Sequence, residues 1–263
     1  MTQRSPKSAP ETGIDWNRFA FRALSILAKD LRMTGKLQPR RLELFVEKLR
    51  VAVSSRDPEA APAVISKMRE AQISSFVIAD HYIPEVARRL GEAWCSDEMD
   101  FATVTIGSAR LQGILRSLGP EWSAEDQHIN PTAPRCMVIV PAGAQHTLGA
   151  TILAGQLRRS GISVSLVVGA QPATLSARCE GASYDAFLIS ASEHEKLNDI
   201  KRIVEAVRSA GEKTPVIVGG NVLALAADVE TQTGADLATS DVEAAIRFCG
   251  FDARLLHLVG EES

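Results

Sequence analysis

The sequence predicts an α/β protein in which a helical bundle precedes a parallel five-stranded sheet. The length of 263 residues exceeds that of one typical domain. Over residues 38–118 apolar side chains recur at the three-to-four spacing of amphipathic helices, whereas over residues 135–263 short apolar runs alternate with helical segments. Alternation of strands and helices is typical of parallel sheets, so the two halves of the chain predict different architectures.

The composition is that of a soluble protein and argues against several classes. Hydrophobic residues make up 45% and charged residues 23% of the chain, and no apolar run reaches the ~18 residues of a membrane span. The first 60 residues carry 12 basic and 7 acidic side chains, a mild excess that a solvated face explains as well as nucleic-acid binding does. Without a signal peptide or a CxxC spacing, the four cysteines indicate reduced thiols and a cytoplasmic protein.

The first segment, residues 1–37, is expected to stand apart from both domains. Residues 1–13 are polar, contain two prolines and predict a disordered tail. An amphipathic helix is expected over residues 15–31, with Asp15 as its cap and Gly35 as the breaker after it. This helix could be a docking arm or could fold back on the bundle, and the sequence leaves both open.

Residues 38–118 predict four or five antiparallel helices joined by short loops, which is the pattern of a helical bundle. Pro58 marks the start of one helix, because proline is tolerated in a first turn. The longest helical patterns cover residues 82–94 and 101–118. Residues 119–134 are polar and rich in turn formers, so we expect a linker there.

Residues 135–263 predict a doubly wound, Rossmann-like (flavodoxin-like) sheet with right-handed crossovers. The first strand is the unbroken apolar run at residues 136–141, which indicates a strand covered on both faces. A helix is expected between Gly149 and Gly161. Further strands are expected at residues 163–168, 186–190, 215–218 and 236–239, and further helices at residues 171–180, 197–208, 223–230 and 242–248.

Loops at the carboxyl ends of three strands are candidates for a ligand site, because ligands of parallel sheets bind there. The first loop, residues 142–149, contains small residues and His146. No G-x-G-x-x-G and no Walker-type lysine loop follows any strand, which disfavours a nucleotide site. The third strand is followed by Ser190, Ala191 and Ser192, and the fourth by Gly219, Gly220 and Asn221. Taken one at a time, these serines could cap turns and these glycines could form a tight turn.

The first loop resembles the cobalamin-binding signature Asp-x-His-x-x-Gly. The matching residues are Ala144-Gln145-His146-Thr147-Leu148-Gly149, in which Ala144 replaces the Asp. The Asp of the signature orients the histidine, so its replacement removes that support. The resemblance implies that His146 binds cobalt and that its neighbours contact the cofactor. It implies cofactor contacts at Gln145, Thr147, Leu148 and Gly149, and a slot for the nucleotide tail lined by Ser190, Ser192, Gly219, Gly220 and Asn221.

The bundle extends this resemblance. Cobalamin proteins of the methionine-synthase and CarH type place a helical bundle before the sheet domain, over the upper face of the corrin. CarH-like sensors carry a Trp followed, after nine residues, by Glu-His. Here the tryptophan is Trp94 and the pair is Val104-Thr105, which argues against a CarH-type adenosyl pocket. Trp94 is a candidate corrin contact, and core packing is the alternative.

Trp94-Cys95, residues 101–112 and residues 145–149 together are similar to the PpaA/AerR family of regulators from purple photosynthetic bacteria. The resemblance implies a light- and redox-responsive antirepressor that binds cobalamin and contacts a PpsR/CrtJ-type repressor of photosynthesis genes. We expect neither an enzyme nor direct DNA binding, because no catalytic domain, zinc site or helix-turn-helix is recognisable. The alternatives are a haem sensor that uses His146, a corrinoid methyl carrier, and an interaction protein whose cofactor site has decayed.

Overall fold

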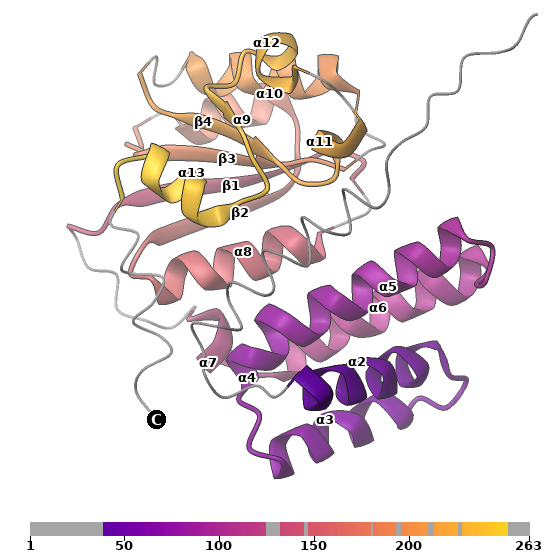
Figure 1. The fold of residues 1–263 in the computed structure, drawn as a ribbon. Helices are drawn as coiled ribbons and strands as arrows, with labels where there is room; N and C mark the ends of the chain where they lie inside the picture. The colour runs from indigo at the N-terminus through magenta and orange to yellow at the C-terminus, as the bar shows by residue number, and fades with distance from the viewer. Residues whose placement is uncertain are drawn as a thin grey trace, which may run out of the picture. The chain divides into compact units, whose positions relative to one another are not determined.

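A computed structural model describes most of the chain beyond the first segment (Figure 1). The expected tail and helix of residues 1–37 lie outside the described residues. Residues 43–263 form one compact unit, and residues 1–42 form another, of which only the start of one helix is described. The described ranges are residues 39–124, 132–144, 147–179, 181–192, 196–209, 213–225 and 228–251.

Residues 39–124 contain only helices and the loops between them, as the apolar spacing predicts. None of the helices in the described ranges combines the length and hydropathy that a bilayer crossing needs. One helical turn, η1, is a π-helix that the sequence analysis did not predict. The elements are α2 (Pro39–Ser54), α3 (Ala60–Glu70), α4 (Ser75–Val77), η1 (Ile78–Tyr82), α5 (Ile83–Cys95), α6 (Phe101–Ser117) and α7 (Pro120–Ser123).

Burial of one face of each helix holds this bundle together. Val46 of α2, Met68 of α3, Leu90 of α5 and Leu111 of α6 are completely buried. Helix α6 begins at a capped end, because the side chain of Asp100 accepts a hydrogen bond from the backbone N–H of Thr103 at 2.8 Å. Local capping and apolar periodicity therefore agree on where this helix starts.

A buried carboxylate joins two arginines on α5. The side chain of Glu85 is only 8% exposed and accepts hydrogen bonds from Arg88 at 2.6 Å and from Arg89 at 2.8 Å. Arg89 also reaches Glu43 of α2 at 2.6 Å. Burial by itself raises the pKa of Glu85, but the hydrogen bonds from Arg88 and Arg89 outweigh it and hold that pKa below its usual range.

The predicted linker contains a short helix. Gly119 takes a φ of +94°, which glycine adopts readily, and α7 follows it at once. Trp122 of α7 is only 3% exposed, so this part of the segment is packed. Residues 125–131 lie outside the described ranges, and the predicted domain boundaries remain predictions.

The second described part is a parallel five-stranded sheet with helices on both faces, which confirms the predicted fold class (Figure 1). The strand order is β2-β1-β3-β4-β5, the flavodoxin-like order. The elements are β1 (Arg135–Pro141), α8 (Leu148–Arg159), β2 (Ser163–Ala170), α9 (Pro172–Cys179), β3 (Ala186–Ser190), α10 (Leu197–Arg208), β4 (Val216–Gly219), α11 (Val222–Leu225), α12 (Val229–Thr233), β5 (Leu237–Ala238) and α13 (Val242–Phe248).

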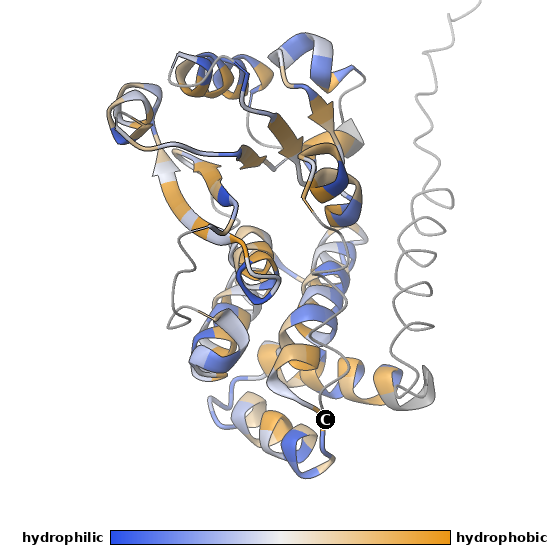
Figure 2. Cartoon of the chain, turned by 90° about the vertical axis from the view of Figure 1, so that its left-hand side faces the viewer, coloured by the Kyte–Doolittle hydropathy of each residue, from blue (hydrophilic) through white to orange (hydrophobic). Residues whose placement is uncertain are grey.

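Strand β1 is buried on both faces, as its unbroken apolar run predicts. Met137 and Ile139 point into a core with helices α9, α10 and α12. Cys136, Val138 and Val140 point into a second core with α8 and α13. Because successive side chains of a strand alternate between faces, an all-apolar strand is needed to serve both cores. The hydropathy colouring of Figure 2 shows the apolar strands between amphipathic helices.

One predicted helix is wrong in its extent. The sequence pattern indicated a single helix over residues 223–230, but the structure has two short helices, α11 and α12. Asp228, directly before α12, has a φ of +58°. That left-handed conformation is incompatible with a continuous right-handed helix. Apolar periodicity alone could not detect this break.

The ion pairs of Glu85 on α5 lead to a prediction about how the free energy of unfolding depends on pH. We expect Glu85→Gln to lower the free energy of unfolding at pH 7 by about 1–3 kcal/mol, because two arginines lose a buried charged acceptor. Since the folded pKa of Glu85 is depressed, its contribution is present above the unfolded pKa of about 4.5 and is lost as pH falls through the lower folded value. Urea unfolding between pH 3 and pH 7 should therefore show a shallower pH dependence in this variant.

Glu92→Gln is the matched control for that experiment. Glu92 also pairs with Arg88, but its side chain is 59% exposed. An exposed pair contributes little, so this variant should change the free energy of unfolding by less than about 1 kcal/mol. Equal losses in both variants would contradict the assignment of Glu85 as the buried centre of the cluster.

Candidate functional site

The strand order places the topological switch point between the ends of β1 and β3. In this topology the connections after β1 and β3 leave the sheet toward opposite faces, and ligands bind at that switch point. Strand β1 pairs with both β2 and β3, so it is the point of reversal. The loop after β1 and the residues after β3 therefore border the predicted ligand site.

The described residues at this crest are small. Ala142 and Gly143 after β1 are exposed, and a Cβ built on Gly143 would meet nothing within 4 Å. Ala144 is half-buried and packs against the core shared with α8 and α13. Gln145 and His146, the centre of the proposed signature, lie outside the described residues. Among the described residues of this loop, Gly143 therefore has free space around it.

Gly219 and Gly220 are required by the backbone around them. A Cβ on Gly219 would lie 2.8 Å from the carbonyl oxygen of Thr239. Gly220 has a φ of +99°, and a Cβ there would collide with the carbonyl oxygen of Ala191. These glycines let the ends of β3, β4 and β5 approach closely. A tight turn therefore accounts for them, and they also keep the crest free of side chains.

The serines occupy different environments. Ser190 is half-buried and pairs in register with Gly219, whereas Ser192 is 8% exposed. The backbone N–H of Ala191 donates to the carbonyl oxygen of Gly219 at 2.9 Å, which fixes the two loops against each other. Asn221 is exposed beside them. The structure thus brings together the predicted residues that follow β3 and β4.

The residues after the histidine begin helix α8. Thr147 precedes the helix, and its carbonyl oxygen accepts a hydrogen bond from the hydroxyl of Thr151 at 2.9 Å. Leu148 is half-buried, while Gly149 is exposed, and a Cβ on Gly149 would meet nothing within 4 Å. The first backbone N–H groups of a helix have no partner inside it, so this turn presents donors at the crest.

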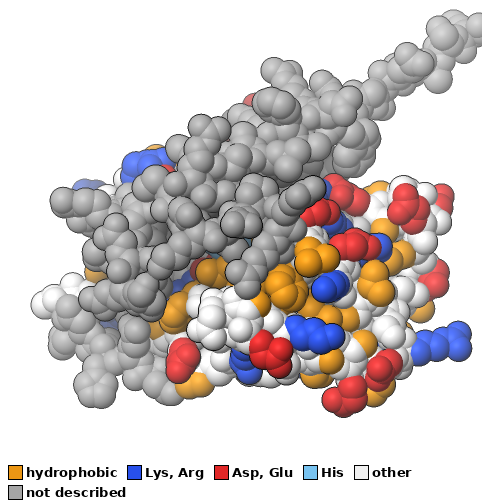
Figure 3. All heavy atoms as spheres, turned by 60° about the horizontal axis from the view of Figure 1, so that its bottom comes forward, with side chains coloured by type: hydrophobic (Ala, Val, Ile, Leu, Met, Phe, Trp, Pro, Cys, Tyr) orange, Lys and Arg blue, Asp and Glu red, His pale blue; other side chains and the backbone are white. Residues whose placement is uncertain are grey.

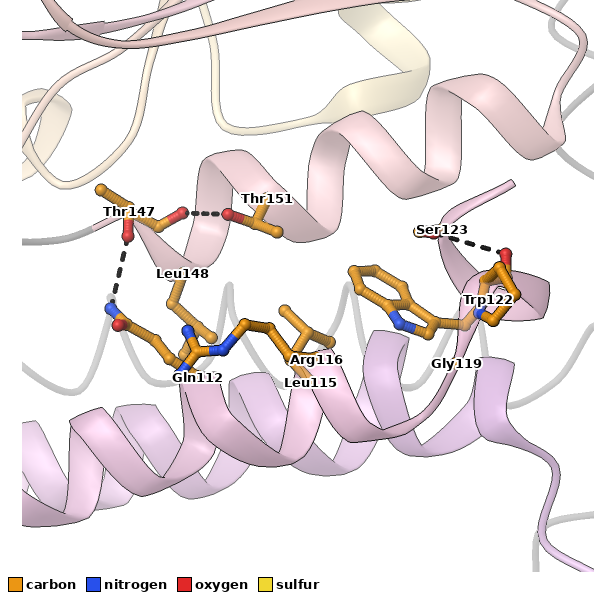
Figure 4. Close-up of a pocket in the computed structure, with 10 residues that line it drawn as sticks. Gln112, Leu115, Arg116, Gly119, Trp122, Ser123, Thr147, Leu148 and Thr151 are labelled. Carbon is orange, nitrogen blue, oxygen red and sulfur yellow. Dashed lines mark hydrogen bonds between the residues drawn. The ribbon is translucent and has the colours of Figure 1, made fainter. Parts of the chain in front are cut away.

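A cleft of about 330 Å³ lies between this turn and helices α6 and α7 (Figure 4). Its polar wall includes Gln112, whose amide nitrogen donates to the hydroxyl of Thr147 at 3.3 Å. The sequence does not predict this cleft, because no motif marks it. Its lining residues are Gln112, Leu115, Arg116, Gly119, Pro120, Trp122, Ser123, Thr147, Leu148 and Thr151.

Trp94 does not belong to the bundle core. Its side chain is 39% exposed and its ring centroid lies 6.1 Å from that of Phe101, which is 62% exposed. We call Trp94 and Phe101 the open apolar face. The sequence left core packing of Trp94 as an alternative, and this exposure disfavours it.

The described residues show no cluster of metal-binding side chains, and one described face carries charges of both signs. No group of three or more His, Cys, Asp or Glu side chains within the described ranges could hold a metal ion. Burial raises the pKa of the Cys136 thiol well above its usual range and that of Cys249 to about 11, so both stay protonated at neutral pH. On the described part of the face in Figure 3, acidic and basic side chains are interspersed.

Comparison with known proteins identifies the sheet domain. The profile of the B12 binding domain family matches residues 134–247. The structure is similar to that of the Methanosarcina barkeri monomethylamine corrinoid protein, with a TM-score of 0.62, 15% sequence identity, and coverage of 78% of this chain and 97% of that one. At this identity the likeness shows the fold, and it extends beyond the sheet domain into the helical part.

A sequence relative covers most of the chain. It is the uncharacterized 20.5 kDa protein in the bchF-crtJ intergenic region of Rhodobacter capsulatus, which is 36% identical over 184 residues. The alignment covers 70% of this chain and 95% of the relative. The chain therefore belongs to the family of that Rhodobacter capsulatus protein and carries, at residues 134–247, a B12 binding domain.

Proposed function

We propose that this protein binds cobalamin at the crest of its sheet and acts as a light- and redox-responsive regulator rather than as an enzyme. The observation that carries the cofactor assignment is the small-residue crest at the ends of β1, β3 and β4, inside the stretch that matches the B12 binding domain. In this proposal the protein works in the cytoplasm, without membrane or sequence-specific DNA contacts. Its partner is a PpsR/CrtJ-type repressor, and contact with this protein stops the repressor from acting.

The residues present fit the cofactor. A Cβ on Gly143 would meet nothing within 4 Å, so this end of β1 has room for part of a ligand, whereas Gly219 and Gly220 allow close backbone packing at the ends of β3, β4 and β5. Ser190 and Ser192 follow β3 beside these glycines, and hydroxyl groups are of the chemical kind that can bond polar atoms of the tail. Bound cobalamin would supply visible-light absorption and a light-sensitive bond on cobalt. The family match favours cobalamin over the haem alternative.

The open apolar face supports a cap over the cofactor. Trp94 and Phe101 expose large aromatic surface, and such surface commonly marks a place where something binds. In this proposal the face covers the upper side of the corrin.

The regulatory role rests on the relative and on the resemblance to the PpaA/AerR family. The relative is encoded between bchF and crtJ, which fits a partner of the CrtJ type. The likeness to the monomethylamine corrinoid protein supports the same fold in a methyl carrier, so the carrier remains the competing function. A carrier must pass a methyl group to a separate catalytic protein, whereas a sensor must change its contact with the repressor.

Titration of the purified protein with hydroxocobalamin tests the cofactor assignment. We expect saturable binding with a shift of the visible absorption bands. His146→Ala should weaken binding by at least about tenfold, because even partners that only orient a ligand are worth 10- to 100-fold. His128→Ala, in the predicted linker, is the control and should bind normally. Equal affinity of both variants and the wild type would reject His146 as the cobalt ligand.

Trp94→Ala tests the cap. Because the indole is part of an exposed surface, its loss should leave the apo protein folded and raise the Kd for hydroxocobalamin about tenfold, equivalent to about 1.4 kcal/mol. Leu44→Ala is the matched control, since Leu44 is a large apolar side chain on α2 that is 51% exposed. An unchanged Kd in the Trp94 variant would place the tryptophan outside the cofactor site.

The regulatory proposal is tested with a PpsR/CrtJ-type repressor bound to its DNA. We expect the cobalamin-loaded protein to lower the repressor's affinity for DNA, and to do so to different extents in darkness and in light. The His146→Ala variant should lose this difference. Methyl transfer from the loaded protein to a thiol acceptor through a partner enzyme, with no effect on the repressor, would support the carrier instead.

A further inference from the structure

A buried ion pair joins helix α8 of the sheet domain to the π-helix η1 of the bundle. Arg159, the last residue of α8, donates to a carboxylate oxygen of Asp80. The two side chains are 5% and 18% exposed. A buried ion pair adds little net stability compared with apolar packing, because both charges lose water. The Arg159–Asp80 pair therefore matters more for fixing the position of α8 against η1 than for stability.

Arg159 holds three segments of the bundle at once. Besides Asp80 of η1, it donates a hydrogen bond to the carbonyl oxygen of Trp122 in α7. Its guanidinium also lies 5.4 Å from the ring centroid of Phe76 in α4. A planar guanidinium can satisfy two acceptors and stack on a ring together, which an ammonium group cannot do. We call Phe76, Asp80, Trp122 and Arg159 the joint.

Asp80 is subject to opposing effects. Burial raises the pKa of Asp80, while the charge and hydrogen bond of Arg159 and a side-chain hydrogen bond with Gln156 of α8 oppose this rise. The second carboxylate oxygen of Asp80 is buried and has no hydrogen-bond partner of good geometry among the described residues. Asp80 lies in the π-helical turn η1, and π-helical turns recur at functional sites.

Helix α8 is shaped to fit this joint. One turn before Arg159 stands Gly155, and a Cβ on Gly155 would lie 2.7 Å from a ring carbon of Trp122. Any larger residue would push α8 away from α7. Figure 4 shows the indole of Trp122 directed toward α8. A glycine and a buried tryptophan thus set the distance, while the ion pair sets the position along the helix.

At the other end of α8, the described residues show a hydrogen bond of 3.3 Å from Gln112 of α6 to Thr147, beside the open cleft (Figure 4). Helix α8 has 12 residues and is about 18 Å long, at about 1.5 Å per residue. The helix therefore runs from the crest, where the cofactor is proposed to bind, to the joint with the bundle.

We infer that Arg159 is a positioning residue that sets the bundle over the crest, so that the joint and cobalamin binding are energetically coupled. This inference rests on the proposed function. No joint residue needs to touch the cofactor, because α8 carries the restraint from one end to the other. By reciprocity, bound cobalamin must strengthen the joint by the same factor by which the joint strengthens cobalamin binding.

The test compares Arg159→Gln, Asp80→Asn and the double variant with the wild type. The readouts are the Kd for hydroxocobalamin and the melting temperature of the apo protein. We expect each single variant to melt lower, because it leaves a buried partner unpaired. The double variant removes both charges and should recover part of the melting temperature. All three should bind hydroxocobalamin about tenfold more weakly, within the usual range of coupling between sites.

Arg208→Gln is the matched control. Arg208 also ends a helix of the sheet domain and pairs with Asp236 at 2.6 Å, but both residues belong to that domain. This variant should melt lower and keep the wild-type Kd. A folded double variant with the wild-type Kd would overturn the inference and leave the proposed function intact. A wild-type protein that does not bind hydroxocobalamin would overturn the proposed function and this inference with it.

Discussion

Burial of β1 on both faces is the constraint on which the rest of this structure depends. Because its side chains serve two separate cores, helices must cover both sides of the sheet, and β1 must lie between two parallel neighbours. Parallel pairing then directs the carboxyl ends of β1, β3 and β4 to one edge. The position of the candidate site is thus a consequence of core formation. The small residues at that edge decide only what can enter it.

The two carboxylates buried beside arginines show how local donors decide the response to burial. Glu85 receives hydrogen bonds from two arginines, which outweigh desolvation and lower its pKa. Asp80 has one arginine and a poorly satisfied second oxygen, so desolvation dominates and its pKa is raised. The first cluster ties helices within the bundle. The second lies where sheet domain and bundle meet, and its weaker satisfaction makes that junction the more easily altered of the two.

The sequence was most informative where a single physical pattern decides the outcome. Strand β1 and helix α10 were predicted with almost their observed bounds, because an unbroken apolar run and an amphipathic repeat are local signals. The break at Asp228 and the π-helix escaped, since left-handed backbone and a widened turn leave no apolar period. The joint escaped as well. Nothing local distinguishes Arg159 from other arginines at helix ends, and only tertiary packing brings Asp80 to it.

Helix α8 connects these observations, because its own sequence specifies a weak helix. Gly149, Thr151 and Gly155 all lower its intrinsic helix propensity. Its stability must therefore come from packing, through buried Ala150, Ala154 and Leu157 on one side and through the joint on the other. Because packing holds α8, the helix moves when the residues that contact it move. A change at the crest that displaces the first turn of α8 therefore alters either the hydrogen bond at Thr147 or the buried ion pair at the far end of the helix.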